Sequence, residues 1–398
     1  MIRHEDHTVE QRARRLHERF EALYGHRPEG VWQAPGRVNL MGEHTDYNLG
    51  YVLPFAIDRQ TLIAVRRVDP DAAHADEIAL ASTMGAGGGA PEVTRMRLAD
   101  LAPGTPAGWA AYPAAVSHVL AAEYAGRIRG FELLVDSTVP VGSGLSSSHA
   151  LEVATIVALN EVLHLGLDAE RMVRLTQRAE NDFVGAPTGI MDQSASLLSQ
   201  AGHALFLDCR SFASRAVPLP LTERGLKVLV IDTRVAHALV DGGYAQRRAS
   251  CEAAAARLGV SSLREIDEVH LLDALEEPLR RRARHIVSEN GRVLHTVQAL
   301  ERGDLNLVGQ LLTESHASMR DDYEISCPEL DLAVSAALEA GALGARMTGG
   351  GFGGSAIALI DETVRPQVES AIRQAFDRAG YAEPGIFVVA PAQGAGRV

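Results

Sequence analysis

The spacing of hydrophobic residues predicts alternating helices and strands along the chain. Thr8 is a typical helix-capping residue; Val9, Leu16 and Phe20 then recur at helical spacing, and Gly25 is expected to end that helix. Further helices are expected over 109–125, from 150 and over 168–184, and strands over 130–137, 203–209 and 227–233. No internal repeat is present, so we expect a two-domain α+β protein with domains 1–201 and 202–398.

Composition narrows the class of protein. The chain has 398 residues, 46% of them hydrophobic, without a continuous apolar run of about 18 residues that would predict a membrane span. Residues 1–20 are charged throughout and lack the apolar core of a secretory signal. The three cysteines, Cys209, Cys251 and Cys327, are widely spaced, which does not suggest a disulfide framework. We therefore expect a cytoplasmic protein that does not bind membranes.

The net charge of −13 changes which partners are expected. Nucleic acid is disfavoured, because binding a duplex depends on a basic surface. An acidic protein that binds an anionic nucleotide needs local positive charge from an arginine, a metal ion or a helix N-terminus.

A dense polar segment follows the strand-like sequence V-N-L-M. Glu43, His44, Thr45 and Asp46 are consecutive, in a stretch (residues 32–57) that also contains Arg37. Carboxylates and imidazole could hold a polyhydroxylated ligand in a fan of hydrogen bonds. A solvated turn is the alternative interpretation. His44 has no second histidine at H-E-x-x-H spacing, so this segment does not predict a zinc site.

A glycine and serine loop, V-P-V-G-S-G-L-S-S-S, opens the helix expected from 150. Gly142 and Gly144 would let a ligand approach the main chain closely, and the serines at 146–148 offer hydroxyls and an N-cap. Free N–H groups and partial positive charge at the helix start suit a phosphate. The loop lacks the lysine of a P-loop, and an ordinary loop with a good N-cap is the alternative.

Two carboxylates further along are candidates for chemistry. Glu180 falls at the edge of the buried face of the helix expected over 168–184, where it could also be a surface residue. Asp192 follows a Pro/Gly turn among apolar and small residues. It could act as a base or positioning group, or it could be a helix N-cap.

Three ordered motifs carry a family resemblance. They are A-P-G-R-V-N-L-M-G-E-H-T-D-Y, V-P-V-G-S-G-L-S-S-S and M-T-G-G-G-F-G-G-S-A. These motifs resemble those of the galactokinase, homoserine kinase, mevalonate kinase and phosphomevalonate kinase (GHMP) superfamily. The first motif and S-H-A-S-M-R-D-D-Y-E-I-S-C-P-E-L-D are similar to galactokinases in particular. The resemblance implies a two-domain GHMP kinase fold, an active site between the domains, and transfer of the γ-phosphoryl of ATP to the C1 hydroxyl of galactose.

The resemblance also implies roles for individual residues, and we expect them as follows. Asp192 and Arg37 flank the reacting hydroxyl as catalytic residues, and Ser148 and Glu180 place Mg²⁺. The sugar would be contacted by Glu43, His44, Thr45, Asp46, Gly189, Asp192 and Tyr244, and the ATP phosphates by Gly142, Ser143, Gly144, Leu145, Ser146, Ser147 and Ser148. One position departs from the pattern: the residue after the three serines is commonly alanine, and here it is His149.

Alternatives within the same superfamily remain open. The chain could phosphorylate N-acetylgalactosamine, another sugar or an isoprenoid alcohol, or it could sense galactose without catalysis. The E-H-T-D-Y run favours a sugar, and the presence of Arg37, Ser148, Glu180 and Asp192 weighs against a silent relative. The expected partners are small molecules, galactose and ATP, and we expect a monomer.

Overall fold

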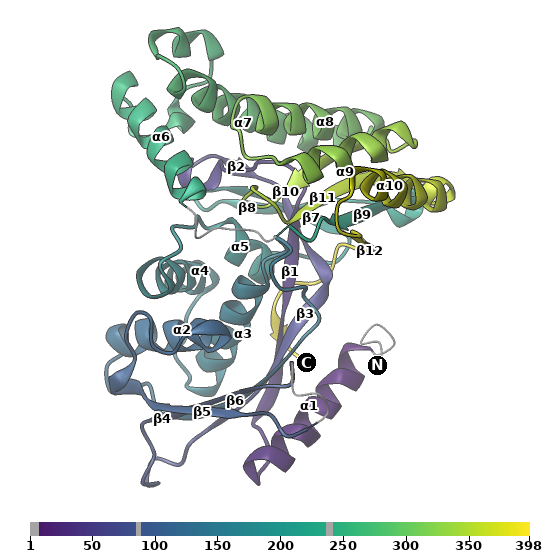
Figure 1. Ribbon diagram of the computed structural model, residues 1–398. Helices are drawn as coiled ribbons and strands as arrows, with labels where there is room; N and C mark the ends of the chain where they lie inside the picture. Colours follow the sequence, from purple (N-terminus) through teal and green to yellow (C-terminus); the bar gives the residue numbers. More distant parts are fainter. Residues whose placement is uncertain (1–7, 85–88, 236–241) are drawn as a thin grey trace.

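The computed structural model describes residues 8–84, 89–235 and 242–398, so the first seven residues of the charged N-terminal stretch lie outside it (Figure 1). The described residues form two lobes, each built on its own sheet. The first helix is confirmed: α1 (Val9–Tyr24) begins at Thr8, whose hydroxyl accepts a hydrogen bond from the N–H of Gln11, and ends at Gly25.

The first lobe is built on a six-stranded sheet of order β13-β1-β3-β6-β4-β5. Its strands are β1 (Gly30–Asn39), β3 (Pro54–Arg67), β4 (Glu77–Ser82), β5 (Val93–Arg97), β6 (Phe131–Ser137) and β13 (Gly396–Arg397). Successive side chains of β3 point to opposite faces. Leu62 and Ala64 pack with α1, whereas Ile63 and Val65 join the core that contains α2 (Ala111–Glu123) and α3 (Ser147–Val162). Helices therefore cover both faces of this sheet.

Two further helices of this lobe lie beside α3 and lead into the site. They are α4 (Ala169–Arg178) and α5 (Met191–Leu198). α4 begins at Asp168, as predicted, but Ala179–Val184 continues it as a π-helical turn. The N–H of Gly185 donates to the carbonyl of Glu180, five residues earlier, at 2.9 Å. Such turns occur often at functional sites.

The second lobe has a four-stranded antiparallel sheet of order β10-β11-β9-β12. Its elements are β9 (Leu226–Asp232), β10 (Gly344–Thr348), β11 (Ser355–Asp361), β12 (Gly385–Val389), α6 (Gly243–Leu258), α7 (Leu279–Arg302), α8 (Leu305–Asp321), α9 (Pro328–Glu339) and α10 (Arg365–Ala379). On β9, Leu229 and Ile231 pack in the core with α9 and α10, while Val228 and Val230 face a core shared with residues of the first lobe such as Phe55. The two lobes are thus joined through an apolar core.

A small third sheet crosses the chain's predicted division. It contains β2 (Tyr51–Val52), β7 (His203–Asp208) and β8 (Ser214–Pro218). In the six-stranded sheet of the first lobe, the C-terminal strand β13 likewise pairs with β1. Segments after residue 201 therefore pair with strands before it, and the boundary at 201/202 stays a prediction. Among the helices in the described part of the chain, none is long and apolar enough to cross a membrane.

Candidate active site

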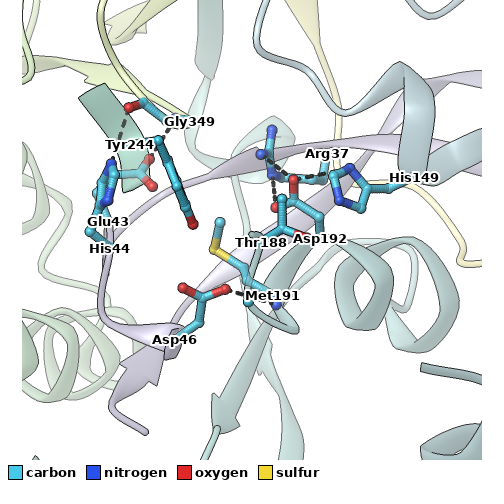
Figure 2. A pocket seen from close by; sticks show the side chains of 12 residues that line it. Arg37, Glu43, His44, Asp46, His149, Thr188, Met191, Asp192, Tyr244 and Gly349 are labelled. Carbon is cyan, nitrogen blue, oxygen red and sulfur yellow. Dashed lines mark hydrogen bonds and ion pairs between the residues drawn. The ribbon is translucent and has the colours of Figure 1, made fainter. Parts of the chain in front are cut away.

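One pocket gathers the two predicted catalytic residues and all the predicted sugar contacts except Thr45, and both lobes contribute to it (Figure 2). Its first-lobe residues come from the end of β1, the turn that follows, α3 and the start of α5. The second lobe adds the first turn of α6 and the loop after β10. The lining residues are Arg37, Glu43, His44, Asp46, His149, Thr188, Gly189, Met191, Asp192, Tyr244, Gly349 and Gly350.

An arginine and an aspartate meet on the side of this pocket that adjoins the serine loop (Figure 2). Arg37 follows a bulge in β1, and its Nε and Nη2 each donate to one oxygen of Asp192 at 2.7 Å. Its Nη1 donates to the carbonyl of Gly144 at 2.6 Å, which ties the pair to the serine loop. Such a bidentate arrangement fixes both side chains. Asp192 is not a helix N-cap, because Ile190 occupies that position in α5.

The surroundings of Asp192 keep it charged. Burial alone would raise its pKa, but Arg37, His149 and the hydroxyl of Ser146 together lower the pKa below the ordinary value of 3.8. Ser146 donates to Asp192 Oδ2, and His149 Nδ1 lies 3.3 Å from the same oxygen. The side chain is still 16% exposed, towards the pocket. Asp192 is therefore an ionised carboxylate that a ligand can reach.

Glu43 and His44 form one wall. Glu43 Oε1 accepts from the N–H of Gly349 at 2.8 Å and lies 3.2 Å from Nη2 of the buried Arg346. Burial raises the pKa of Glu43, and the charges of Arg346 and Arg37 oppose that rise. The ring of His44 is fixed at both nitrogens, with Nδ1 2.7 Å from the hydroxyl of Tyr47 and Nε2 3.0 Å from the carbonyl of Gly350. Both side chains are pre-organised before any ligand binds.

Asp46 lies in the pocket beside Met191 (Figure 2), and Gly189 leaves the space that the Asp46 carboxylate needs. A Cβ atom at Gly189 would lie 1.9 Å from Asp46 Oδ2, so only glycine leaves room for that carboxylate. Asp46 accepts from the N–H groups of Met191 and Tyr47 at 3.2 and 2.9 Å. Burial and then the charge of Asp192 raise the pKa of Asp46. The Tyr244 side chain reaches into the pocket near His44 (Figure 2).

Thr45 is the exception among the predicted sugar contacts. It is fully buried and does not line the pocket. Its hydroxyl lies 2.9 Å from the carbonyl of Gly42 and 2.6 Å from that of Tyr51. We therefore assign Thr45 to holding the turn that presents His44 and Asp46, because its polar atom is already bonded to the main chain.

The serine loop has the backbone that its glycines predict. Gly142 and Gly144 both have positive φ, at 75° and 77°. Ser355 of the third motif donates to the carbonyl of Ser143 at 2.7 Å, so the two glycine loops pack together. Ser146 holds the N-cap position of α3, but its side chain makes no capping hydrogen bond and goes to Asp192 instead. A serine thus stands at the N-cap as predicted, but it makes no capping hydrogen bond, and the first turn of α3 keeps N–H groups for an anion.

The remaining loop residues differ in what they can offer a nucleotide. Leu145 is fully buried in the shared core, so only its main chain faces the loop. Ser147 is the first residue of α3. The hydroxyl of Ser148 lies 3.3 Å from His149 Nδ1. Glu180 is buried, and its Oε2 has no hydrogen-bond partner among the described residues, although it lies 3.4 Å from His149 Nε2.

Several pocket features could not be assigned from the sequence. Thr188 and Met191 line the pocket, and the main chain of Gly350 contributes to it. His149 was recognised only as a departure from a pattern, yet it contacts both Asp192 and Glu180. Its position in the first turn of α3, directly after the serine loop, was the available signal.

Comparison with known families agrees with the motifs. Three family models match the chain: the galactokinase galactose-binding signature at residues 18–67, the N terminal domain of GHMP kinases at residues 111–200 and the C terminal domain of GHMP kinases at residues 296–378. A galactokinase of Streptomyces coelicolor is 49% identical over 386 residues, covering 96% of this chain and 97% of the relative. One of Mycobacterium tuberculosis is 44% identical over 366 residues, covering 91% and 97%.

Solved structures show the same relationship. Galactokinase of Lactococcus lactis, in a complex with galactose, matches with a TM-score of 0.88 and 33% identity, covering 97% of this chain and 99% of that chain. A mevalonate kinase of Methanococcus jannaschii matches with a TM-score of 0.64 and 18% identity over 91% and 98% of the two chains, which is similarity of fold alone.

Proposed function

The chain belongs to the galactokinase family of GHMP kinases, and from this premise we propose how its residues transfer the γ-phosphoryl of ATP to the C1 hydroxyl of D-galactose. The products are galactose 1-phosphate and ADP. The observation that carries the proposal is the Arg37–Asp192 pair, which lies between the polar pocket and the serine loop. An acceptor hydroxyl in the pocket and a phosphate on the loop would meet at this pair.

Asp192 is the proposed base. Its lowered pKa keeps it ionised at neutral pH, so it can accept the proton of the C1 hydroxyl as the oxygen attacks phosphorus. Arg37 holds the carboxylate in place through two hydrogen bonds and brings a positive charge to the position where phosphoryl charge develops. Phosphoryl transfer requires little else than positioning and charge neutralisation.

Galactose is proposed to bind against Glu43, His44, Asp46, Gly189 and Tyr244. These groups include the carboxylates of Glu43 and Asp46 as hydrogen-bond acceptors, and their own partners hold them in fixed orientations. A rigid set of polar atoms can distinguish the C4 epimers galactose and glucose, which differ in the direction of one hydroxyl. The pocket chemistry therefore fits a free sugar better than an apolar isoprenoid alcohol.

ATP is proposed to bind along the loop from Gly142 to Ser148 and the start of α3. Ser148 and Glu180 supply oxygen atoms of the kind that Mg²⁺ prefers, and the unpartnered Oε2 of Glu180 fits a cation. When bound there, Mg²⁺ would neutralise phosphate charge in a chain whose net charge is −13. His149 adds a bulkier group beside Glu180 than the alanine common at this position, but it removes none of these oxygens.

The experiment that tests this function is a survey of acceptors. Purified protein is incubated with ATP, Mg²⁺ and free sugars including galactose, glucose and N-acetylgalactosamine, and ADP formation is measured. We expect galactose to be the best acceptor and phosphorus NMR to show a phosphate on its anomeric carbon. No ADP formation with any sugar would support the silent galactose sensor, and a preference for N-acetylgalactosamine would support that alternative kinase. The cytoplasmic location and the monomeric state stay predictions.

A further inference from the structure

A second polar cluster lies beside the pocket, on the helix that starts at the serine loop. His149 and Glu152 are three residues apart on α3, which places them on one helix face, and Glu180 faces them from the π-helical turn. One ligand atom from each residue can be chosen so that all three lie within 4.8 Å of one another. All three residues are buried, with exposed fractions of 3%, 0% and 2%. The proposed function uses only Glu180 of this set.

The polar atoms of the cluster lack partners outside it. Both carboxylate oxygens of Glu152, Oε2 of Glu180 and Nε2 of His149 have no hydrogen bond to any described residue beyond these three. Nε2 of His149 and Oε2 of Glu180 are 3.4 Å apart. Arg37, the guanidinium of the adjoining pocket, is already bonded to Asp192 and to the carbonyl of Gly144. Two buried carboxylates beside a single imidazole, which can carry at most one positive charge, are costly, so the cluster requires a further proton or a cation.

We propose that His149, Glu152 and Glu180 form a binding site for a divalent transition-metal ion such as Mn²⁺ or Co²⁺. The donor set is one imidazole nitrogen and two carboxylates. Mg²⁺ prefers oxygen ligands, whereas imidazole suits the later divalent metals, whose affinity for such a site rises from Mn²⁺ to Co²⁺. Two of the three ligands, His149 and Glu152, are outside the Mg²⁺ set proposed for the nucleotide.

The inference rests on the proposed function only in sharing Glu180, so it is tested on the full chain without nucleotide or sugar. Mn²⁺ is titrated into metal-free protein and the free ion is counted by electron paramagnetic resonance. Pulsed measurements on the bound ion then detect magnetic coupling to a ligand nitrogen. We expect about one bound Mn²⁺ per chain, coupling to one imidazole nitrogen, and tighter binding of Co²⁺ than of Mg²⁺.

Two variants and one control make the test specific. His149→Ala introduces the small residue common at this position and should remove the nitrogen coupling and weaken Mn²⁺ binding at least tenfold. Glu152→Gln keeps the shape of the side chain and should weaken binding by a similar factor while the nitrogen coupling of any bound ion remains. His118→Ala is the matched control, because His118 packs against Phe183 of the same π-helical turn, 5.2 Å between ring centroids, outside the cluster.

The outcomes separate this site from the kinase assignment. Failure of the folded wild-type chain to bind Mn²⁺ without nucleotide would overturn the proposal and indicate that the two carboxylates share a proton. Equal affinity in wild type, His149→Ala and Glu152→Gln, or nitrogen coupling that survives in His149→Ala, would overturn it as well. None of these results bears on whether the chain phosphorylates galactose, which is measured separately with Mg²⁺ and ATP.

Discussion

Replacing Asp192 by asparagine removes the charge of the proposed base and keeps its size. The wild-type carboxylate accepts from Arg37 through both oxygens at 2.7 Å, and from Ser146. An amide can accept through its oxygen, but its NH₂ group cannot accept from the second guanidinium donor. Arg37 would therefore lose one charge-assisted hydrogen bond and its counterion. The variant tests catalysis and pairing together.

The two effects differ in size and can be separated. A positioned base contributes about 10²–10⁴-fold to the rate, which corresponds to roughly 2.7–5.4 kcal/mol at 1.36 kcal/mol per tenfold. Loss of a hydrogen bond to a charged group costs about 1.5–3 kcal/mol of folding stability. We expect the lower end of the stability range, because the Asp192 side chain is 16% exposed and water can approach Arg37 from the pocket.

The assay measures kcat from ADP release and the galactose Kd by calorimetry. We expect kcat of Asp192→Asn to fall about 10²–10⁴-fold, while the galactose Kd changes only slightly, since Glu43, His44 and Asp46 remain. Asp322→Asn is the matched control, because it removes an aspartate paired with Arg284 at the surface, and it should leave kcat unchanged. A folded Asp192→Asn protein with wild-type kcat would refute the assignment of the base.

Three further predictions follow from other contacts. Glu180→Ala should raise the Mg²⁺ concentration needed for half-maximal activity, and an unchanged magnesium titration would exclude Glu180 as a ligand. Gly189→Ala places a Cβ atom 1.9 Å from Asp46 Oδ2. Because Asp46 would be displaced from the sugar, KM for galactose should rise at least about tenfold while KM for ATP stays unchanged. Gly291→Ala is the control and should leave both constants as they are, because a Cβ atom there meets nothing within 4 Å. Because the pKa of Asp192 is lowered from 3.8, the carboxylate stays charged at every pH above that value. We therefore expect no fall in kcat/KM near pH 6.5, the ordinary histidine pKa. The folding stability that Asp192 contributes should be present above its unfolded pKa of about 3.9 and be lost only as pH falls through the lower folded pKa. A midpoint near pH 6.5 would indicate that a histidine, not Asp192, accepts the proton.

Elements with strong local signals could be predicted from the sequence. α1 begins after Thr8 and ends at Gly25 because capping and left-handed backbone are properties of those residues. The expected strands over 203–209 and 227–233 correspond to β7 and β9. The π-helical turn at Ala179–Val184 could not be predicted, because its five-residue hydrogen bond leaves no distinctive hydrophobic spacing.

In the site, too, some features could be predicted from the sequence and others could not. The proximity of Arg37 and Asp192 came from a resemblance, since no local pattern relates residues on β1 and α5. A serine occupies the N-cap position of α3, as predicted, but its oxygen accepts no capping hydrogen bond from a backbone N–H, and the Ser146 hydroxyl donates to Asp192. The resemblance implied that Thr45 contacts the sugar, whereas its hydroxyl bonds to the main chain. Long-range partners decided the first two outcomes, and main-chain groups of the same turn decided the third.

The central claim is that fixed polar groups in this pocket select galactose for phosphorylation. The most direct test compares kcat/KM for galactose and glucose in the unmodified protein under identical ATP and Mg²⁺ concentrations. A site built to hydrogen-bond a particular hydroxyl can reject the wrong epimer by on the order of 10³ or more. Asp46 and Tyr244 are the groups we expect to make that distinction. We predict a galactose preference of on the order of 10³ or greater; comparable kcat/KM values for the two hexoses would contradict the account.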